Sequence, residues 1–72
     1  MRSFVDDAGQ RWQVMLGKES WGTLVLLFSR MDGAEARTSV LSAETMLAAN
    51  AELDAMSDDD LRVRLHESRP WT

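Results

Sequence analysis

Three consecutive acidic residues, Asp58, Asp59 and Asp60, form the densest cluster of side chains able to do chemistry. Clustered carboxylates can bind Mg²⁺ or Ca²⁺, because both ions prefer oxygen ligands. Consecutive residues on a helix point about 100° apart, so three in a row do not converge on one ion. The sequence also lacks the glycine and distal glutamate of a calcium-binding loop. We therefore interpret the run as the acidic start of a helix, where the dipole favours negative charge, and predict no metal site.

The other residues with catalytic potential are scattered. The sequence contains one histidine, His66, and no cysteine, which excludes thiolate and multi-histidine metal sites. A serine nucleophile needs a base and an orienting group, and the serines at 20, 29, 42 and 57 fall at predicted loop, strand or cap positions. The glycines of the chain are isolated from one another, unlike those of a phosphate-binding loop. We predict no enzyme, cofactor or small-molecule substrate; a deep pocket with perturbed titratable groups would indicate the opposite.

Three tryptophans in 72 residues indicate a different kind of chemistry, that of binding. Trp12 falls on the inward face of a predicted strand and is expected in the core, with its indole N–H bonded at the edge. Trp21 lies in a loop between glycines, and Trp71 follows Pro70 in a short tail. Tryptophan is common among interface hot spots, so Trp21 and Trp71 are candidate anchors for a partner. The alternatives are a lid over the sheet for Trp21, and a tail docked back or disordered for Trp71.

Arginines near these tryptophans suggest an alternative function. Arg11, Arg30 and Arg37 with the tryptophans resemble the basic, aromatic surfaces that bind single-stranded nucleic acid. The net charge of the chain is −4, however, and its distribution is uneven. Residues 1–41 carry five basic and five acidic side chains, and residues 42–72 carry three and seven. Because the basic footprint is missing, we expect nucleic acid to be an unlikely partner and keep it as the alternative.

The elements that position these residues begin with a run of predicted strands. Residues 3–6, 11–16, 22–29 and 36–41 have strand character, separated by turns at Gly9, at residues 17–22 and at Asp32-Gly33. In the fourth strand, Thr38 and Val40 are expected to point inward. Residues 1–41 are therefore predicted to form a three- to four-stranded antiparallel meander.

The third strand is the most informative of these segments, because it is apolar on both faces. Leu24, Leu26 and Phe28 point to one side and Val25 and Leu27 to the other. A strand with two apolar faces needs cover on both. A chain this short can cover only one, so the second face requires a partner. We expect Val5, Met15, Val25 and Leu27 on this second face, rimmed by Gln13, Thr23 and Ser29.

From Ser42 onward the apolar period changes from 2 to about 3.6, which predicts helices. A first helix is expected from an N-cap at Ser42, with its apolar stripe made by Met46, Ala49, Leu53 and Met56. A second is expected from a cap at Ser57, with Asp60 at the third position and a Met56–Leu61 staple. Asp58–Arg62 and Asp60–Arg64 have the spacing of ion pairs along this helix. Pro70 is expected to prevent any continuation.

Two motifs resemble a pattern of short, uncharacterised bacterial proteins. The first is Phe4-x-Asp6-x-x-Gly9-x-x-Trp12-x-Val14, and the second is Leu53-x-x-Met56-Ser57-Asp58-x-x-Leu61. The resemblance covers most of the chain, and its motifs are a turn glycine, core residues and a helix cap. It implies a shared small α+β fold and no activity.

These observations predict one α+β domain over residues 1–72, with a meander over 1–41 and a helical part over 42–72. The predicted function is a non-catalytic protein-interaction module, acting as a homo-oligomer or as an accessory subunit of a larger assembly. Its candidate interface is Val5, Met15, Trp21, Val25, Leu27 and Trp71. Without an apolar run long enough for a membrane span or a signal peptide, the sequence predicts a cytoplasmic protein.

Overall fold

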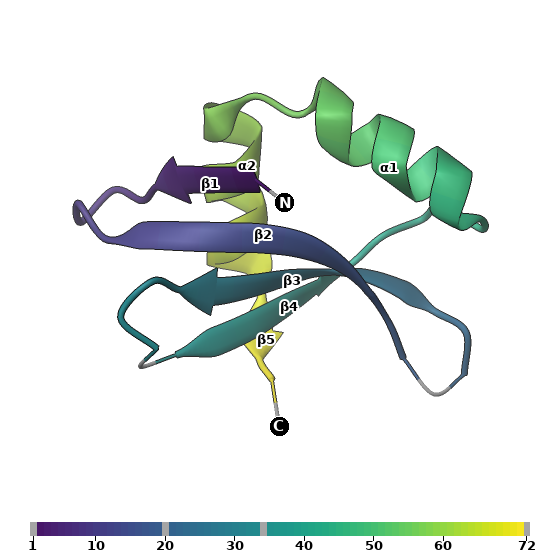
Figure 1. Ribbon diagram of the computed structural model, residues 1–72, viewed down its shortest axis with the longest axis horizontal. Helices are drawn as coiled ribbons and strands as arrows, with labels where there is room; N and C mark the ends of the chain where they lie inside the picture. The colour runs from purple at the N-terminus through teal and green to yellow at the C-terminus, as the bar shows by residue number, and fades with distance from the viewer. Residues whose placement is uncertain (1, 20, 34, 72) are drawn as a thin grey trace.

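The computed structural model describes residues 2–19, 21–33 and 35–71 (Figure 1). The described residues form strands β1 (Arg2–Val5), β2 (Arg11–Lys18), β3 (Leu24–Arg30), β4 (Ala36–Val40) and β5 (Arg69–Pro70). Helices α1 (Met46–Ala55) and α2 (Asp58–Glu67) lie between β4 and β5. The α+β class, the antiparallel meander and the C-terminal helices are confirmed. The prediction of three or four strands was too low, because the tail beyond α2 returns to the sheet as β5 instead of belonging to a wholly helical segment.

Each strand pairs antiparallel with the next, in the order β1-β2-β3-β4-β5. The register places Met15 opposite Leu27, and Leu27 opposite Thr38. Side chains of paired residues lie on the same side of a sheet, so the register defines two faces. One face carries Phe4, Trp12, Val14, Leu26 and Phe28, and the opposite face carries Val5, Met15, Val25, Leu27 and Thr38.

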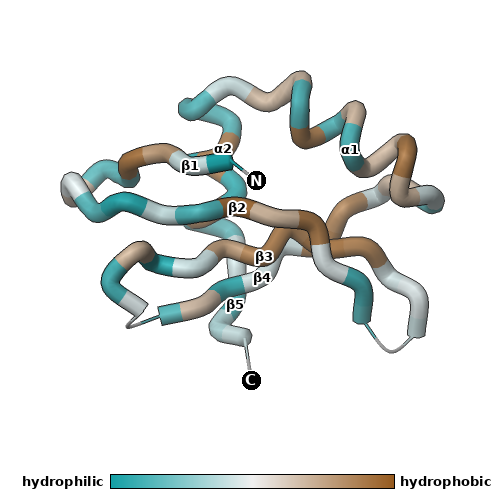
Figure 2. The backbone as a smooth tube through the Cα atoms, viewed as in Figure 1, coloured by the Kyte–Doolittle hydropathy of each residue, from teal (hydrophilic) through white to brown (hydrophobic). Residues whose placement is uncertain are grey.

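Both helices cover the first of these faces, which we call the helix-covered face (Figure 1). Ala49 and Leu53 of α1 and Leu61 of α2 complete its buried cluster. Within it, the rings of Phe4 and Phe28 meet edge to face with centroids 5.9 Å apart. Trp12 is buried there, as predicted. The apolar stretch of β3 runs through the middle of the molecule (Figure 2), and its second side belongs to what we call the open face.

The start of α2 is formed as the sequence predicts. The Ser57 hydroxyl accepts a hydrogen bond from the Asp60 N–H, and the Asp60 carboxylate accepts one from the Ser57 N–H. This reciprocal capping box satisfies two backbone donors that the helix itself leaves unpaired. Met56 packs against the core that contains Leu61, as the predicted staple requires.

The start of α1 differs from its prediction, because Thr45 and not Ser42 is the N-cap. The Thr45 side chain accepts a hydrogen bond from the Ala48 N–H. Leu41 still donates its N–H to the Leu24 carbonyl, so the chain follows the sheet up to that point. A helix starting at Ser42 would begin immediately after Leu41, which is still hydrogen-bonded to β3. The predicted first turn therefore moves three residues along the chain.

The predicted facing of β4 was also wrong. Thr38 and Val40 pair with Leu27 and Val25, so they lie on the open face, and Val40 is 48% exposed. Ser39, paired with Leu26, is buried on the helix-covered face instead. The side chains of residues 36–40 do not alternate clearly between apolar and polar, so the two sides of this strand differ little in hydrophobicity. Pairing with β3 decides the facing here.

The charged side chains of α2 do not form the ion pairs predicted from helical spacing, Asp58–Arg62 and Asp60–Arg64, and contact other residues instead. Asp58 pairs with Arg2 of β1 at 3.2 Å, and Arg64 pairs with Glu52 of α1 at 3.4 Å. Arg62 contacts Asp59 and donates to the Val5 carbonyl. These contacts tie α2 to β1 and α1.

No helix in the described part of the chain has the length and apolar character needed to cross a membrane.

Candidate functional site

The open face contains a groove of about 430 Å³ between the β2–β3 hairpin and the C-terminal tail. Its lining combines an apolar floor with polar ends: Gly17, Lys18, Glu19, Trp21, Val25, Leu27, Thr38 and Trp71. In Figure 1 the β2–β3 hairpin and β5 both lie below α1, at the lower part of the view. Segments that are distant in the sequence thus form the two walls. We call this hollow the open-face groove.

The hairpin wall presents Trp21, whose surface is 94% exposed. The turn is closed by the Glu19 N–H donating to the Thr23 carbonyl and the Gly22 N–H donating to the Glu19 carbonyl. Gly22 has a φ of 85°, a conformation that side chains with a Cβ disfavour. The turn geometry therefore holds Trp21 in solvent. An indole this exposed gains no burial energy from the fold itself.

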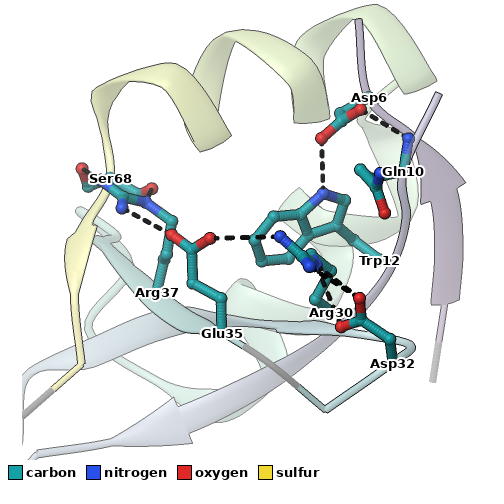
Figure 3. Close-up of polar contacts among 8 residues, drawn as sticks. All are labelled: Asp6, Gln10, Trp12, Arg30, Asp32, Glu35, Arg37 and Ser68. Carbon is teal, nitrogen blue, oxygen red and sulfur yellow. Dashed lines mark hydrogen bonds and ion pairs between the residues drawn. The ribbon is translucent and has the colours of Figure 1, made fainter. Parts of the chain in front are cut away.

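The tail wall presents Trp71, which is 60% exposed. Its backbone N–H donates to the Ala36 carbonyl at 3.0 Å and continues the β4–β5 pairing. Arg37 of β4 secures the start of the tail by donating to the Ser68 hydroxyl at 2.8 Å and to the Ser68 carbonyl at 2.7 Å (Figure 3). Glu35 holds the same guanidinium at 2.9 Å. The backbone at Trp71 is therefore held by its pairing with β4.

The floor of the groove depends on a residue without a side chain. Gly17 pairs with Val25, and a Cβ at position 17 would lie 3.3 Å from a Val25 methyl group. Val25 is only 4% exposed even though it points to the open face, while the neighbouring Leu27 is half-buried. Gly17 therefore leaves room above the floor that a larger residue would fill.

A second hollow of about 440 Å³ adjoins the first on the tail side. Glu19, Thr38 and Trp71 line both hollows, and Arg69 and Pro70 line the second. Trp71 is thus a ridge shared by the two hollows. Together they form a surface that can take an extended ligand lying across β4 and the tail.

The structure brings four of the six predicted interface residues into one site. Trp21, Val25, Leu27 and Trp71 all line the open-face groove. Met15 pairs with Leu27 and is 40% exposed on the same face. Val5 shares this face but lies on β1, paired with Arg11 and outside the groove lining.

Sequence reasoning missed the polar residues of the site. Lys18 and Glu19 sit next to Trp21 in the sequence, and this adjacency is a signal that could have placed them at the hairpin wall. Thr38 was expected to point inward, and Arg69 was expected in a tail without strand pairing. Both positions follow from pairing of β4 with its two neighbours.

The arginines of the nucleic-acid alternative lie apart. Arg30 pairs with Asp32 and Glu35, which also raises its pKa above the ordinary value, chiefly through the hydrogen bond to Asp32. Arg37 points to the helix-covered face and pairs with Glu35. Arg11 lies on the open face, beside Arg2, Ser3, Gln13 and Met31. They do not form one basic surface with Trp21 and Trp71.

The candidate chemical residues have separate structural partners. Asp58 contacts Arg2, Asp59 contacts Arg62, and Asp60 caps its own helix. Across residues 2–19, 21–33 and 35–71, no three His, Asp or Glu side chains gather as metal ligands would. His66 contacts Asp7 at 2.8 Å on the surface. Ser29 lies on β3, Ser57 is a helix cap, and Ser20 lies outside the described residues.

Asp6 is an acidic residue with a shifted pKa, and its role is structural. The Trp12 indole N–H donates to the Asp6 carboxylate at 2.8 Å (Figure 3). This bond, together with the backbone N–H groups of Gln10 and Ala8, lowers the pKa of Asp6 below its ordinary value. The carboxylate closes the β1–β2 turn and satisfies the one polar atom of a buried tryptophan side chain.

Comparison of the chain with protein-family models, with curated proteins and with solved structures finds no match. The resemblance to short bacterial proteins stays a prediction. The geometry and charge of the open face are therefore the basis for assigning a function.

Proposed function

We propose that this protein is a non-catalytic interaction module that binds another protein chain through its open face. The partner is a second copy of the chain or a component of a larger assembly. The observation that carries this proposal is the open-face groove, with Val25 and Leu27 at its floor and two exposed tryptophans as its walls. Solvent-facing tryptophans around an apolar floor are typical of binding hot spots.

The arrangement of the helices supports the same proposal. Both helices pack on one face, so Met15, Leu27 and Val40 have no helix above them within the described chain. A small monomer gains nothing by leaving such a surface in water, and apolar patches of this kind usually mark contact sites.

The edges of the sheet favour binding by the face over strand addition. The outer strand β5 is two residues long and contains Pro70, which lacks an N–H. On β1 the Val5 carbonyl already accepts a hydrogen bond from Arg62 at 2.7 Å. Short, proline-containing or capped edges oppose pairing with another chain.

The test replaces a residue that binding needs and the fold does not. Trp21→Ala should leave the unfolding midpoint nearly unchanged, because the side chain is 94% exposed. It should weaken self-association or partner binding by about 30-fold or more, the size of a hot-spot loss. Leu47→Ala is the matched control, since Leu47 is 82% exposed on α1, away from the groove. Sedimentation of the purified chain and capture of partners by each variant provide the two measurements.

A second variant tests the floor. Leu27→Lys should dissociate the assembly while far-ultraviolet circular dichroism shows that secondary structure is retained. A wild-type chain that stays monomeric at high concentration and captures no partner would contradict the proposal. Equal binding by wild type and Trp21→Ala would contradict the assignment to this face.

A further inference from the structure

The charges of the described residues divide into those used by the fold and those left over. Arg2, Arg30, Arg37, Arg62 and Arg64 each contact a carboxylate within the chain. In residues 2–19, 21–33 and 35–71, Arg11, Lys18 and Arg69 make no such ion pair. The fold therefore neutralises five of its cations and leaves three available.

Two of the three available cations, Arg11 and Arg69, lie on the open face, and Lys18 lies at the end of β2, where it lines the groove. Arg69 pairs with Thr38 and lines the hollow beyond Trp71. Lys18 lines the open-face groove at the hairpin wall. Arg11 lies on the same face but at a separate hollow, with Arg2, Ser3, Gln13 and Met31. Glu19 is the one acidic side chain lining these hollows among the described residues.

The available acidic residues lie elsewhere. Glu44, Asp54 and Glu67 lie in or just before the helices and make no ion pair within the described chain. Two open faces brought together would thus set an excess of positive charge against its like, which opposes a symmetric pair of copies. A partner segment carrying negative charge would instead meet Lys18 and Arg69, which outnumber Glu19 in the lining of the two hollows.

We propose, on the basis of the proposed function, that the occupant is an extended acidic segment of a different protein. An apolar side chain of that segment lies between Trp21 and Trp71, above Val25 and Leu27. Its flanking carboxylates meet Lys18 at one end and Arg69 at the other. Apolar contact supplies the anchor, and the cations select against neutral and basic sequences.

The dimensions agree with a short extended peptide. At about 3.3 Å per residue, an extended segment of about nine residues is about 30 Å long, which does not exceed the 32 Å longest extent of the molecule. The groove and the adjoining hollow, about 430 and 440 Å³, leave room for side chains on either side of Trp71. The overall charge of −4 disfavours a long polyanion, which separates this occupant from a nucleic acid.

The experiment titrates the full chain with fluorescein-labelled peptides of about nine residues. One series places a leucine or phenylalanine among aspartates and glutamates, and matched series replace the acids by lysine or by serine. Others keep the acids and replace the apolar residue by serine, and a labelled oligothymidylate is titrated in parallel. Anisotropy reports binding, at low and at moderate salt.

Acidic peptides with an apolar residue should bind, and lysine peptides should not. Lys18→Gln and Arg69→Gln should each weaken binding by about two- to fivefold, as for partly exposed charges. Arg11→Gln is the matched control, because it removes the same charge from the same face outside the groove. Trp21→Ala should weaken binding by about 30-fold or more.

Several results would overturn this inference while the proposed function stands. One is equal binding of serine and acidic peptides, and another is an effect of Arg11→Gln as large as that of Arg69→Gln. Self-association that Trp21→Ala abolishes would identify a second copy as the occupant. Tighter binding of the oligothymidylate than of any peptide would overturn both proposals in favour of nucleic acid.

Discussion

The helix-covered face and the open face of this sheet are built from the same strands, yet they use their apolar residues differently. On β3, Leu26 and Phe28 are fully buried beneath the helices. Leu27, between them in sequence, is half-buried at the floor of a groove. Around it, Met15 and Val40 are 40% and 48% exposed. The helix-covered face completes its packing within the chain, whereas the open face buries Val25 but leaves Leu27, Met15 and Val40 partly exposed.

The distribution of charged contacts repeats this contrast. On and around the helix-covered face, Arg2, Arg62 and Arg64 contact residues of other elements and hold the helices in place. Arg69 and Arg11 on the open face, and Lys18 at the end of β2 beside the groove, lack ion pairs within the described chain. We infer that stability and recognition are assigned to opposite faces. Substitutions on each face test this contrast, because they should change either the stability of the fold or binding at the groove.

The largest effect is expected in the core of the helix-covered face. Leu61→Ala should lower the free energy of unfolding by about 2–5 kcal/mol, because it leaves a cavity beneath α2. Val63→Ala, two residues away and 57% exposed, is the control and should change it by about 0.5 kcal/mol or less. Urea unfolding of both variants gives the comparison. Similar losses for the two would mean that α2 is not anchored through Leu61.

A smaller effect is expected at Arg37, which links the two faces. Its side chain lies on the helix-covered face and donates hydrogen bonds to Ser68. The tail that starts at Ser68 places Trp71 at the open-face groove. Arg37→Gln should cost about 1–3 kcal/mol through lost charged hydrogen bonds. It should also speed exchange of the Trp71 amide hydrogen, measured by NMR. Unchanged protection of that amide would show that strand pairing alone positions the tail.

The helix cap at Ser57 is expected to contribute about 1 kcal/mol. Ser57→Ala removes the acceptor for the Asp60 N–H, and a lost cap typically costs this much. Asp59→Ala should matter far less, since Asp59 is outside the capping box. Binding at the groove should be unaffected by either change. A rise in melting temperature on adding Mg²⁺ or Ca²⁺ would contradict our interpretation of residues 58–60.

The effect of pH is expected to be the smallest and to act through Asp6. The folded pKa of Asp6 lies below its ordinary value of 3.8, so its ionised form stabilises the fold. That contribution is present in full well above the ordinary pKa of 3.8 and is lost as the pH falls through the folded pKa. Asp6→Asn should therefore differ from wild type by about 1 kcal/mol at neutral pH and by less in acid. A difference that stays constant with pH would exclude this linkage.

The sequence by itself determined the parts of the fold that depend on local chemistry. Alternating residues such as Trp12 and Val14 specify both a strand and the side that is buried. Ser57 and Asp60 specify where α2 begins, because a cap needs only its own few residues. The two-sided apolar pattern of β3 also predicted Val25 and Leu27 on a second face. For Trp21 and Trp71 the sequence left two alternatives open, exposure or packing within the chain, and the structure shows both side chains exposed.

Only the tertiary structure decided the features that join distant segments. The facing of β4 came from its register with β3, because residues 36–40 have little alternation of their own. Strand β5 exists because Arg69 and Pro70 meet Thr38 and Arg37, some thirty positions earlier in the chain. The open-face groove depends on that return, since it brings Trp71 opposite Trp21. Such pairings are selected by the packing of the whole domain, and no short stretch of sequence encodes them.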